Sequence, residues 1–105
     1  MDSEPRSARL SPELFDLLFE GCRVERVPSG RDLFVQDDLA DRLYGVIAGS
    51  VEISIYSPDG QKLVANIEQS KSLVGEIGAL DGGKRTATAT SRDGCELVSI
   101  SRRQL

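Results

Sequence analysis

The chain has 105 residues, of which 39% are hydrophobic and 5% aromatic, and this gives room for one compact core. Its formal net charge of −4 and pI near 4.8 argue against a protein that finds nucleic acid through overall positive charge. Histidine is absent, which removes the usual general base and the commonest transition-metal ligand, so we expect neither a metal nor a cofactor.

The cysteines and the apolar runs indicate the compartment of the protein. Cys22 and Cys95 lie far apart, without the spacing of a zinc site or a disulfide framework, and two thiols in a reducing compartment are expected. No apolar run approaches the ~18 residues that are needed to span a bilayer. Residues 1–9 also lack a hydrophobic signal segment. We therefore predict a cytoplasmic location without membrane contact.

The N-terminal segment predicts a tail followed by a helix. Residues 1–9 are polar and mixed in charge, which is typical of a flexible tail, so the folded domain is expected over residues 10–105. Ser11 is a good N-cap, Pro12 suits the first helical position, and Glu13 is favourable at the positive end of the helix dipole.

Five apolar residues between positions 14 and 19 predict the buried face of this helix. Three leucines share one face at helical spacing, and two phenylalanines widen the stripe: Leu14, Leu17 and Leu18, with Phe15 and Phe19. Gly21 is the expected stop. Either this stripe packs on the domain, or it is an exposed surface that binds a partner chain.

From Cys22 onward the apolar period changes to two, which predicts strands. We expect strands at 23–27 and 33–35, separated by a turn at 28–30. Residues 36–42 form an acidic segment that lacks the spacing of a calcium loop, and a solvated turn is expected there.

The middle of the chain predicts three strands and a hairpin. Residues 43–56 are expected to form two strands about a turn at Gly49, with alternate residues from Val51 onward facing inward. Residues 57–60, Ser-Pro-Asp-Gly, are a strong hairpin signal. The return strand is expected over 61–67, with its buried face formed by Leu63, Ala65 and Ile67.

Two more strands, 86–90 and 96–100, are expected after a glycine-rich loop, with a turn at 92–94 between them. About seven short strands with turns at this cadence predict a mainly β fold, a sandwich or small barrel with one helix in front.

The loop at 74–88 concentrates charge and backbone freedom. Backbone N–H groups at the start of a short helix, beside glycines that permit close approach, favour an anion. Arg85 follows and could fork two N–H bonds onto a phosphate. Glu76 would repel that phosphate, so it needs another partner, such as a hydroxyl group. The alternative is a salt bridge between Glu76 and Arg85 that steadies a surface hairpin.

Residues 75–88, Gly-Glu-Ile-Gly-Ala-Leu-Asp-Gly-Gly-Lys-Arg-Thr-Ala-Thr, resemble the phosphate-binding cassette of the cyclic-nucleotide-binding domain family. The resemblance implies that Glu76 holds the ribose 2′-hydroxyl, that Arg85 holds the cyclic phosphate, and that backbone amides of the short helix complete the anion site. The ligand-binding residues it implies are Gly75, Glu76, Ile77, Gly78, Ala79, Arg85, Thr86 and Ala87.

The resemblance covers residues 10–105 and implies a β jelly roll with an N-terminal helix and a short helix in the cassette. Three departures accompany it. Val74 replaces an aromatic residue that is frequent in the family, and residues 68–73 lack its Pro-Gly turn. The chain ends at Leu105, where family members continue into helices that cover the base, so we expect weakened affinity or base selectivity.

The resemblance implies a non-catalytic module that binds cAMP or cGMP and couples binding to an output domain outside the chain, as in catabolite-activator-type transcription regulators. The frequency of cAMP as a ligand in the family favours cAMP. A threonine directly after the arginine, as at Thr86, resembles the pattern of family domains that accept cGMP. The module itself should not bind DNA, and a homodimer partner is compatible with it. A jelly roll that kept the fold as an interaction or dimerisation module is the alternative. A cupin-type enzyme is disfavoured because histidine is absent.

Overall fold

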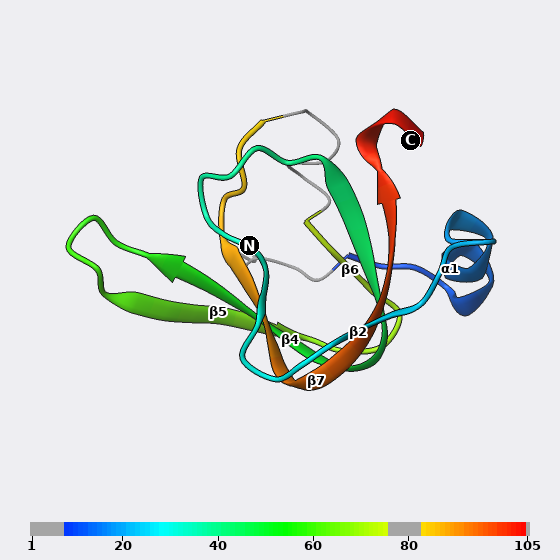
Figure 1. The fold of residues 1–105 in the computed structure, drawn as a ribbon, viewed down its shortest axis with the longest axis horizontal. Helices are drawn as coiled ribbons and strands as arrows, with labels where there is room; N and C mark the ends of the chain where they lie inside the picture. Colours follow the sequence, from blue (N-terminus) through cyan, green and yellow to red (C-terminus); the bar gives the residue numbers. More distant parts are fainter. Residues whose placement is uncertain (1–7, 76–82, 105) are drawn as a thin grey trace, which may run out of the picture.

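The computed structural model describes residues 8–75 and 83–104, and these form a mainly β fold, as predicted. Two long strands, β4 (Arg42–Tyr56) and β7 (Thr88–Ser101), pair with each other in antiparallel fashion along most of their length. The other strands attach to these two, and both long strands curve so that the sheet folds over itself (Figure 1). This arrangement agrees with the expected jelly roll.

The shorter strands extend the sheet on both sides. The sheet order is β1–β6–β4–β7–β2, with β3 paired to β7 and β5 paired to β4. The bounds are β1 Ala8–Arg9, β2 Glu25–Val27, β3 Asp32–Phe34, β5 Lys62–Glu68 and β6 Ser72–Val74. The β4–β5 hairpin extends from one end of the molecule, and α1 (Pro12–Leu18) lies at the opposite end (Figure 1). A 3₁₀ helix, η1 (Arg102–Gln104), follows β7.

The start of α1 is as predicted. The Ser11 side chain accepts a hydrogen bond from the Leu14 amide, and Pro12 occupies the first turn. The tail prediction was wrong for residues 8 and 9, because Ala8 and Arg9 pair with Leu73 and Ser72 of β6. Residues 1–7 lie outside the described part of the chain, as does the expected cassette helix.

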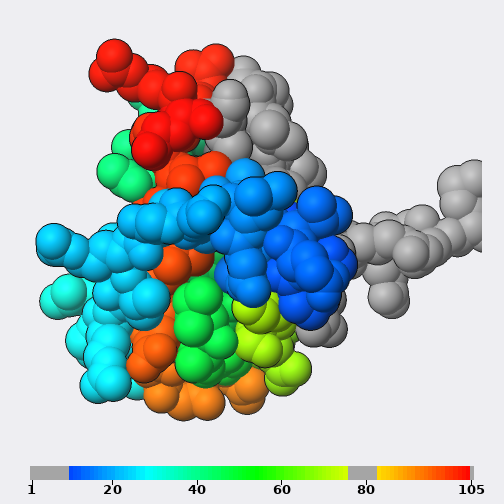
Figure 2. All heavy atoms as spheres, turned by 90° about the vertical axis from the view of Figure 1, so that its right-hand side faces the viewer, coloured from blue at the N-terminus to red at the C-terminus, as the bar shows by residue number. Residues whose placement is uncertain are grey.

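The predicted inner face of α1 was wrong in part. Phe15, Phe19 and Leu18 pack on the sheet, whereas Leu14 and Leu17 are 55% and 67% exposed. Figure 2 shows α1 at the surface, with the segment that leads to β2 running across the same face. The two phenylalanine rings lie over Gly45, where a Cβ atom would come within 2.6 Å of Phe19. Glycine at this position lets the helix sit directly on β4.

Two predicted turns are bends inside continuous strands. Gly49 has a φ of +79°, and the pairing of β4 with β7 shifts register beside it, so residues 43–56 belong to one strand instead of two. Gly94 has a φ of +81° within β7, so the two strands expected at 86–90 and 96–100 are also one. Thr86 and Ala87 precede this strand.

The hairpin turn at 57–60 is confirmed, with Gly60 at a φ of +89°. The expected buried face of its strands was wrong toward the tip, because Ile55 and Leu63 are exposed. The hairpin extends beyond the core there, so both of its faces meet solvent. The segment at 68–73 reverses through Lys71, which has a φ of +70° and donates its amide to the Val46 carbonyl at 2.8 Å.

Among residues 8–75 and 83–104, two apolar clusters form the core. One lies under α1 and contains Phe15, Phe19, Leu43, Leu73, Val98 and Ile100. The other lies between the folded halves of the sheet and contains Val46, Val51, Val74, Ala89, Cys95 and Leu97. Within residues 8–75 and 83–104, no helix has the length and apolar character that crossing a membrane requires.

Candidate functional site

Arg85 is the centre of the candidate site. Its side chain is only 3% exposed, although it carries a charge. Nη1 donates to the Gly75 carbonyl at 3.0 Å, and Nη2 donates to the Arg42 carbonyl at 2.7 Å. The buried Nε has no hydrogen-bond partner. No acidic side chain of residues 8–75 and 83–104 makes an ion pair with it. The guanidinium therefore keeps one donor unsatisfied in the interior.

Two aromatic rings form the apolar side of the Arg85 environment. The guanidinium carbon lies 4.0 Å from the Phe34 ring centroid and 5.9 Å from that of Tyr44. Burial lowers the pKa of Arg85, and Tyr44, Asp41 and Asp38 oppose that shift. Burial also raises the pKa of the Tyr44 phenol, with Arg85 acting in the opposite direction. The planar guanidinium is thus held between ring faces and backbone carbonyls.

Gly75 is required by the close approach of Arg85. Its φ is +82°, a left-handed conformation that favours glycine, and a Cβ atom would lie 2.3 Å from Nη1 of Arg85. The predicted pair of Gly75 and Arg85 is therefore brought into direct contact.

The acidic turn at 36–42 supports Arg85 through its backbone. The Arg85 amide donates to the Asp38 carbonyl at 2.7 Å, and the Asp37 amide donates to the Arg85 carbonyl at 2.8 Å. Leu39 and Lys84 form an isolated bridge beside these bonds. The expectation of a solvated turn holds for the side chains of Asp37 and Asp38, which are exposed, but it missed this backbone role. The described part of the chain contains no acidic cluster that could hold a metal ion.

The other predicted site residues divide into two groups. Thr86 is exposed and Ala87 is half-buried, and both directly follow Arg85. Glu76, Ile77, Gly78 and Ala79 lie outside the described residues. The alternative salt bridge between Glu76 and Arg85 therefore stays a prediction.

Sequence reasoning missed the residues that surround the guanidinium. Phe34 and Tyr44 come from β3 and β4, and Arg42 contributes only its carbonyl. Their positions lie about 40 to 50 residues before Arg85, so no local spacing relates them. The signal that could have suggested them is the aromatic residue in each of these two strands, because a buried arginine is often stacked on a ring.

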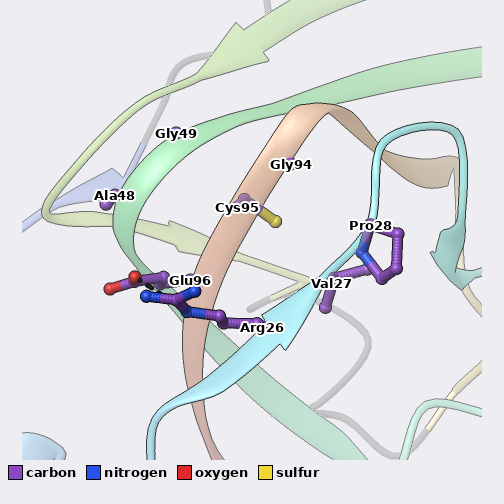
Figure 3. A pocket seen from close by; sticks show the side chains of 8 residues that line it. All are labelled: Arg26, Val27, Pro28, Ala48, Gly49, Gly94, Cys95 and Glu96. Atoms are coloured by element: carbon purple, nitrogen blue, oxygen red, sulfur yellow. Dashed lines mark ion pairs between the residues drawn. The ribbon is translucent and has the colours of Figure 1, made fainter.

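Two hollows lie away from the guanidinium. One, of about 470 Å³, lies where β2 crosses β4 and β7, and it is lined in part by Val27, Gly49 and Cys95 (Figure 3). The ion pair between Arg26 and Glu96 borders it, with N–O 3.4 Å. The second, of about 620 Å³, lies between the acidic turn and the hairpin tip. None of the residues predicted for the ligand lines either hollow.

A buried cation with a free N–H donor is suited to bind an anion. Among the described residues, Arg85 contacts backbone carbonyls and aromatic rings, and these contacts are of the kind that recognise a ligand through charge and hydrogen bonds.

Three comparisons place this chain among known proteins. The CRP-like cAMP-activated global transcriptional regulator of Mycobacterium tuberculosis is 35% identical over 75 residues, which are 71% of this chain and 34% of that protein. The crystal structure of the Thermus thermophilus catabolite activator protein matches with a TM-score of 0.79 and 32% identity, covering 90% of this chain and 44% of that one. The c-di-GMP responsive global regulator CLP of Xanthomonas campestris matches with a TM-score of 0.79 and 31% identity, covering 89% and 45%.

The matched part of this chain thus spans less than half the length of each of these three proteins. The family model described as the cyclic nucleotide-binding domain matches residues 24–105, which include β2 to β7 and the environment of Arg85. The chain belongs to the cyclic nucleotide-binding domain family.

Proposed function

We propose that this chain is a non-catalytic receptor module for a 3′,5′-cyclic mononucleotide. Arg85 pairs with the cyclic phosphate, and Glu76 accepts a hydrogen bond from the ribose 2′-hydroxyl. Backbone groups of Gly75, Gly78 and Ala79 complete the anion site. Ile77, Thr86 and Ala87 border the same ligand. Support comes from the family, the sequence of residues 75–88 and the position of Arg85 beside Gly75.

The observation that carries the proposal is the unsatisfied Nε of Arg85. Keeping a cation in the interior is costly when it lacks a charged partner, and a buried donor without an acceptor adds to that cost. A phosphate oxygen would satisfy both requirements through a charge-assisted hydrogen bond. Buried charged side chains in proteins are normally paired, so a guanidinium placed only to strengthen the fold would be expected to have a carboxylate partner.

The identity of the base is a separate question. Names of relatives point in two directions: one similar regulator is called cAMP-activated, and another is called c-di-GMP responsive. Thr86 is exposed beside Arg85, where its hydroxyl group is free to meet a base. The frequency of cAMP in the family favours this nucleotide, and cGMP is the second candidate.

The module regulates an output domain outside these residues. The similar regulators are about twice as long as this chain, and one is named a transcriptional regulator. Ligand binding at Arg85 would be transmitted to such a domain in the cytoplasm. This chain itself has no part in binding DNA or membranes, in agreement with its net charge of −4.

Titration calorimetry with cAMP and cGMP tests the proposal. Hydrogen bonds to a charged group contribute roughly 1.5–3 kcal/mol, so Arg85→Ala should weaken binding by about ten- to a hundredfold or more. Arg26→Ala is the matched control, because it removes an equal charge from an arginine whose side chain is 87% exposed. The receptor assignment is overturned if neither nucleotide binds, or if Arg85→Ala binds as tightly as the unmodified chain.

A second candidate function is that of an interaction module without a ligand. The exposed leucines of α1, Leu14 and Leu17, favour it because they form an apolar surface at one end of the molecule. A ligand that binds only the native state must raise the unfolding temperature. A folded β protein whose unfolding temperature is unchanged by excess nucleotide would support this second function.

A further inference from the structure

Glu68, the last residue of β5, is a buried carboxylate that the proposed receptor function does not use. It is 7% exposed, and its Oε2 accepts a hydrogen bond from the Asn66 side-chain amide at 3.3 Å. Its Oε1 has no partner. In the part of the chain that the structure describes, two buried side-chain atoms are without a hydrogen bond: Glu68 Oε1 and Arg85 Nε. They have opposite hydrogen-bonding character, one accepting and one donating.

The strand register relates Glu68 to Phe34, the residue whose ring contacts the Arg85 guanidinium. Residues directly opposite each other in an antiparallel sheet point to the same side. One such row crosses four strands, running from Asn66 to Ile53, Ala89 and Phe34. Glu68 lies two residues from Asn66 on the same face and pairs with Val51, which is fully buried. At the other end of the row, the Arg85 guanidinium stacks on the Phe34 ring.

The residues of this row that lie between Glu68 and Arg85 are apolar. Ile53, Ala89 and Phe34 all belong to or pack against the second core cluster. Three strand spacings of ~4.8 Å separate the ends of the row, roughly 14 Å along the sheet before its curvature shortens the path. Glu68 and Arg85 do not form an ion pair with each other. This face therefore suits a flat ligand with an anion at one end and N–H donors at the other.

We propose that Glu68 recognises the base of the nucleotide and selects guanine, so that the ligand is cyclic GMP, against the preference for cAMP that family frequency alone gives. This inference rests on the proposed receptor function. The Watson–Crick edge of guanine presents two neighbouring donors, N1–H and the N2 amino group. The unpartnered Oε1 can accept one of them, and Oε2 can accept the other with the lone pair that Asn66 does not use. The corresponding edge of adenine presents one amino donor beside the N1 acceptor, which a carboxylate repels.

Asn66 prepares the carboxylate for this role. Its side-chain amide holds Oε2, and its own carbonyl oxygen accepts the Ile67 amide at 2.9 Å. Glu68 is thus fixed by its neighbour while Oε1 stays available as an acceptor. A site built around a buried acceptor strongly rejects a ligand that lacks the matching donor, because the acceptor is then left unpaired.

Titration of the chain with three nucleotides tests the inference: cyclic GMP, cyclic AMP and cyclic IMP. Cyclic IMP keeps the N1–H of guanine but lacks the amino group. We expect cyclic GMP to bind at least about tenfold more tightly than cyclic AMP, with cyclic IMP between them. This series of ligands needs no variant and cannot be affected by misfolding.

Glu68→Gln completes the test with an isosteric change. It should weaken cyclic GMP binding by about tenfold or more and leave cyclic AMP within about threefold, so the selectivity ratio collapses. Glu52→Gln is the control, because Glu52 points to the opposite face of β4 and pairs with Lys62. That variant should keep the selectivity ratio.

The possible failures are distinguishable. If cyclic AMP binds as tightly as cyclic GMP, or if Glu68→Gln leaves the selectivity ratio unchanged, the role of Glu68 is overturned while the receptor function stands. If none of the three nucleotides binds, the receptor function is overturned, and the inference about Glu68 falls with it.

Discussion

At the scale of single residues, Arg85 is held in the interior without an acidic partner among the described residues. Two carbonyls and the Phe34 ring provide its contacts, and they fix the plane of the guanidinium. A lysine could not reproduce this geometry, because an ammonium group is a point charge without a planar fork. The orientation of the free Nε donor is therefore set by the fold before any ligand arrives.

Gly75→Ala should destabilise the chain more than Gly60→Ala does. Both glycines have a positive φ, and forcing alanine into that conformation costs about 1–2 kcal/mol. Nothing lies within 4 Å of a Cβ at Gly60, whereas at Gly75 the Cβ would meet Arg85 and add about 1–3 kcal/mol for overpacking. Urea unfolding of both variants measures the difference. Equal losses would contradict the close contact between Gly75 and Arg85.

The sequence predicted those site residues that lie close to one another along the chain, and it missed those that lie far apart. Gly75 and Arg85 lie within one 14-residue motif, and the resemblance of that motif to the family's cassette indicated a common role. Phe34, Tyr44 and Glu68 reach the same interior only through strand pairing, and their local patterns are those of ordinary strands. Glu68 in particular could not be recognised, because its burial depends on its register with Val51.

At the scale of elements, α1 shows why the existence of a helix is easier to predict than its orientation. Ser11 and Pro12 marked its start from local chemistry. Five apolar residues between 14 and 19 surround more than half of the helix, so periodicity does not choose among them. The choice is made by β4, where Gly45 leaves space for the rings of Phe15 and Phe19. Lys71 adds an ion pair with Asp16 at 2.9 Å.

Phe15→Ala should cost about 3–5 kcal/mol of unfolding free energy, because it empties a fully buried position. Leu17→Ala is the matched change on the outward face and should stay within about 0.5 kcal/mol. Chemical denaturation followed by circular dichroism measures both. A large loss for Leu17→Ala would show that this face is covered in solution.

The long strands were misjudged for a related reason. Gly49 and Gly94 are typical turn signals, and a local pattern cannot separate a turn from a bulge that bends a strand. In the fold, a Cβ at Gly49 would lie 2.2 Å from the Gly94 carbonyl oxygen, so the two bends fit against each other. These glycines act as bends instead of turns because β4 and β7 pair with each other on both sides of them.

At the scale of the whole molecule, β4 and β7 connect the two apolar clusters. Leu43 and Ile100 belong to the cluster under α1, while Val51 and Ala89 of the same strands belong to the other. Opening one cluster therefore breaks pairing that also supports the second. The mainly β class was predictable from alternation, but this continuity depends on contacts between distant residues.

We expect one unfolding transition for the whole described domain. Leu43→Ala should lower its midpoint through a loss of about 2–5 kcal/mol, and Val51→Ala, in the other cluster, should lower the same transition. The dependence of free energy on urea should keep its slope in both variants. Far-ultraviolet circular dichroism and tyrosine fluorescence provide two probes. A second transition in either variant would show that the clusters unfold independently.

The backbone bonds between the acidic turn and Arg85 have a consequence for transplanting the site. The Asp37 amide donates to the Arg85 carbonyl, and the Arg85 amide donates to the Asp38 carbonyl. The Thr88 hydroxyl accepts a hydrogen bond from the Gln36 amide at 2.9 Å. A chimera in which only residues 75–88 are placed on another jelly roll would contain the arginine but would lack the backbone hydrogen bonds that fix its position. Moving residues 36–42 together with the cassette is the smallest exchange that keeps these bonds.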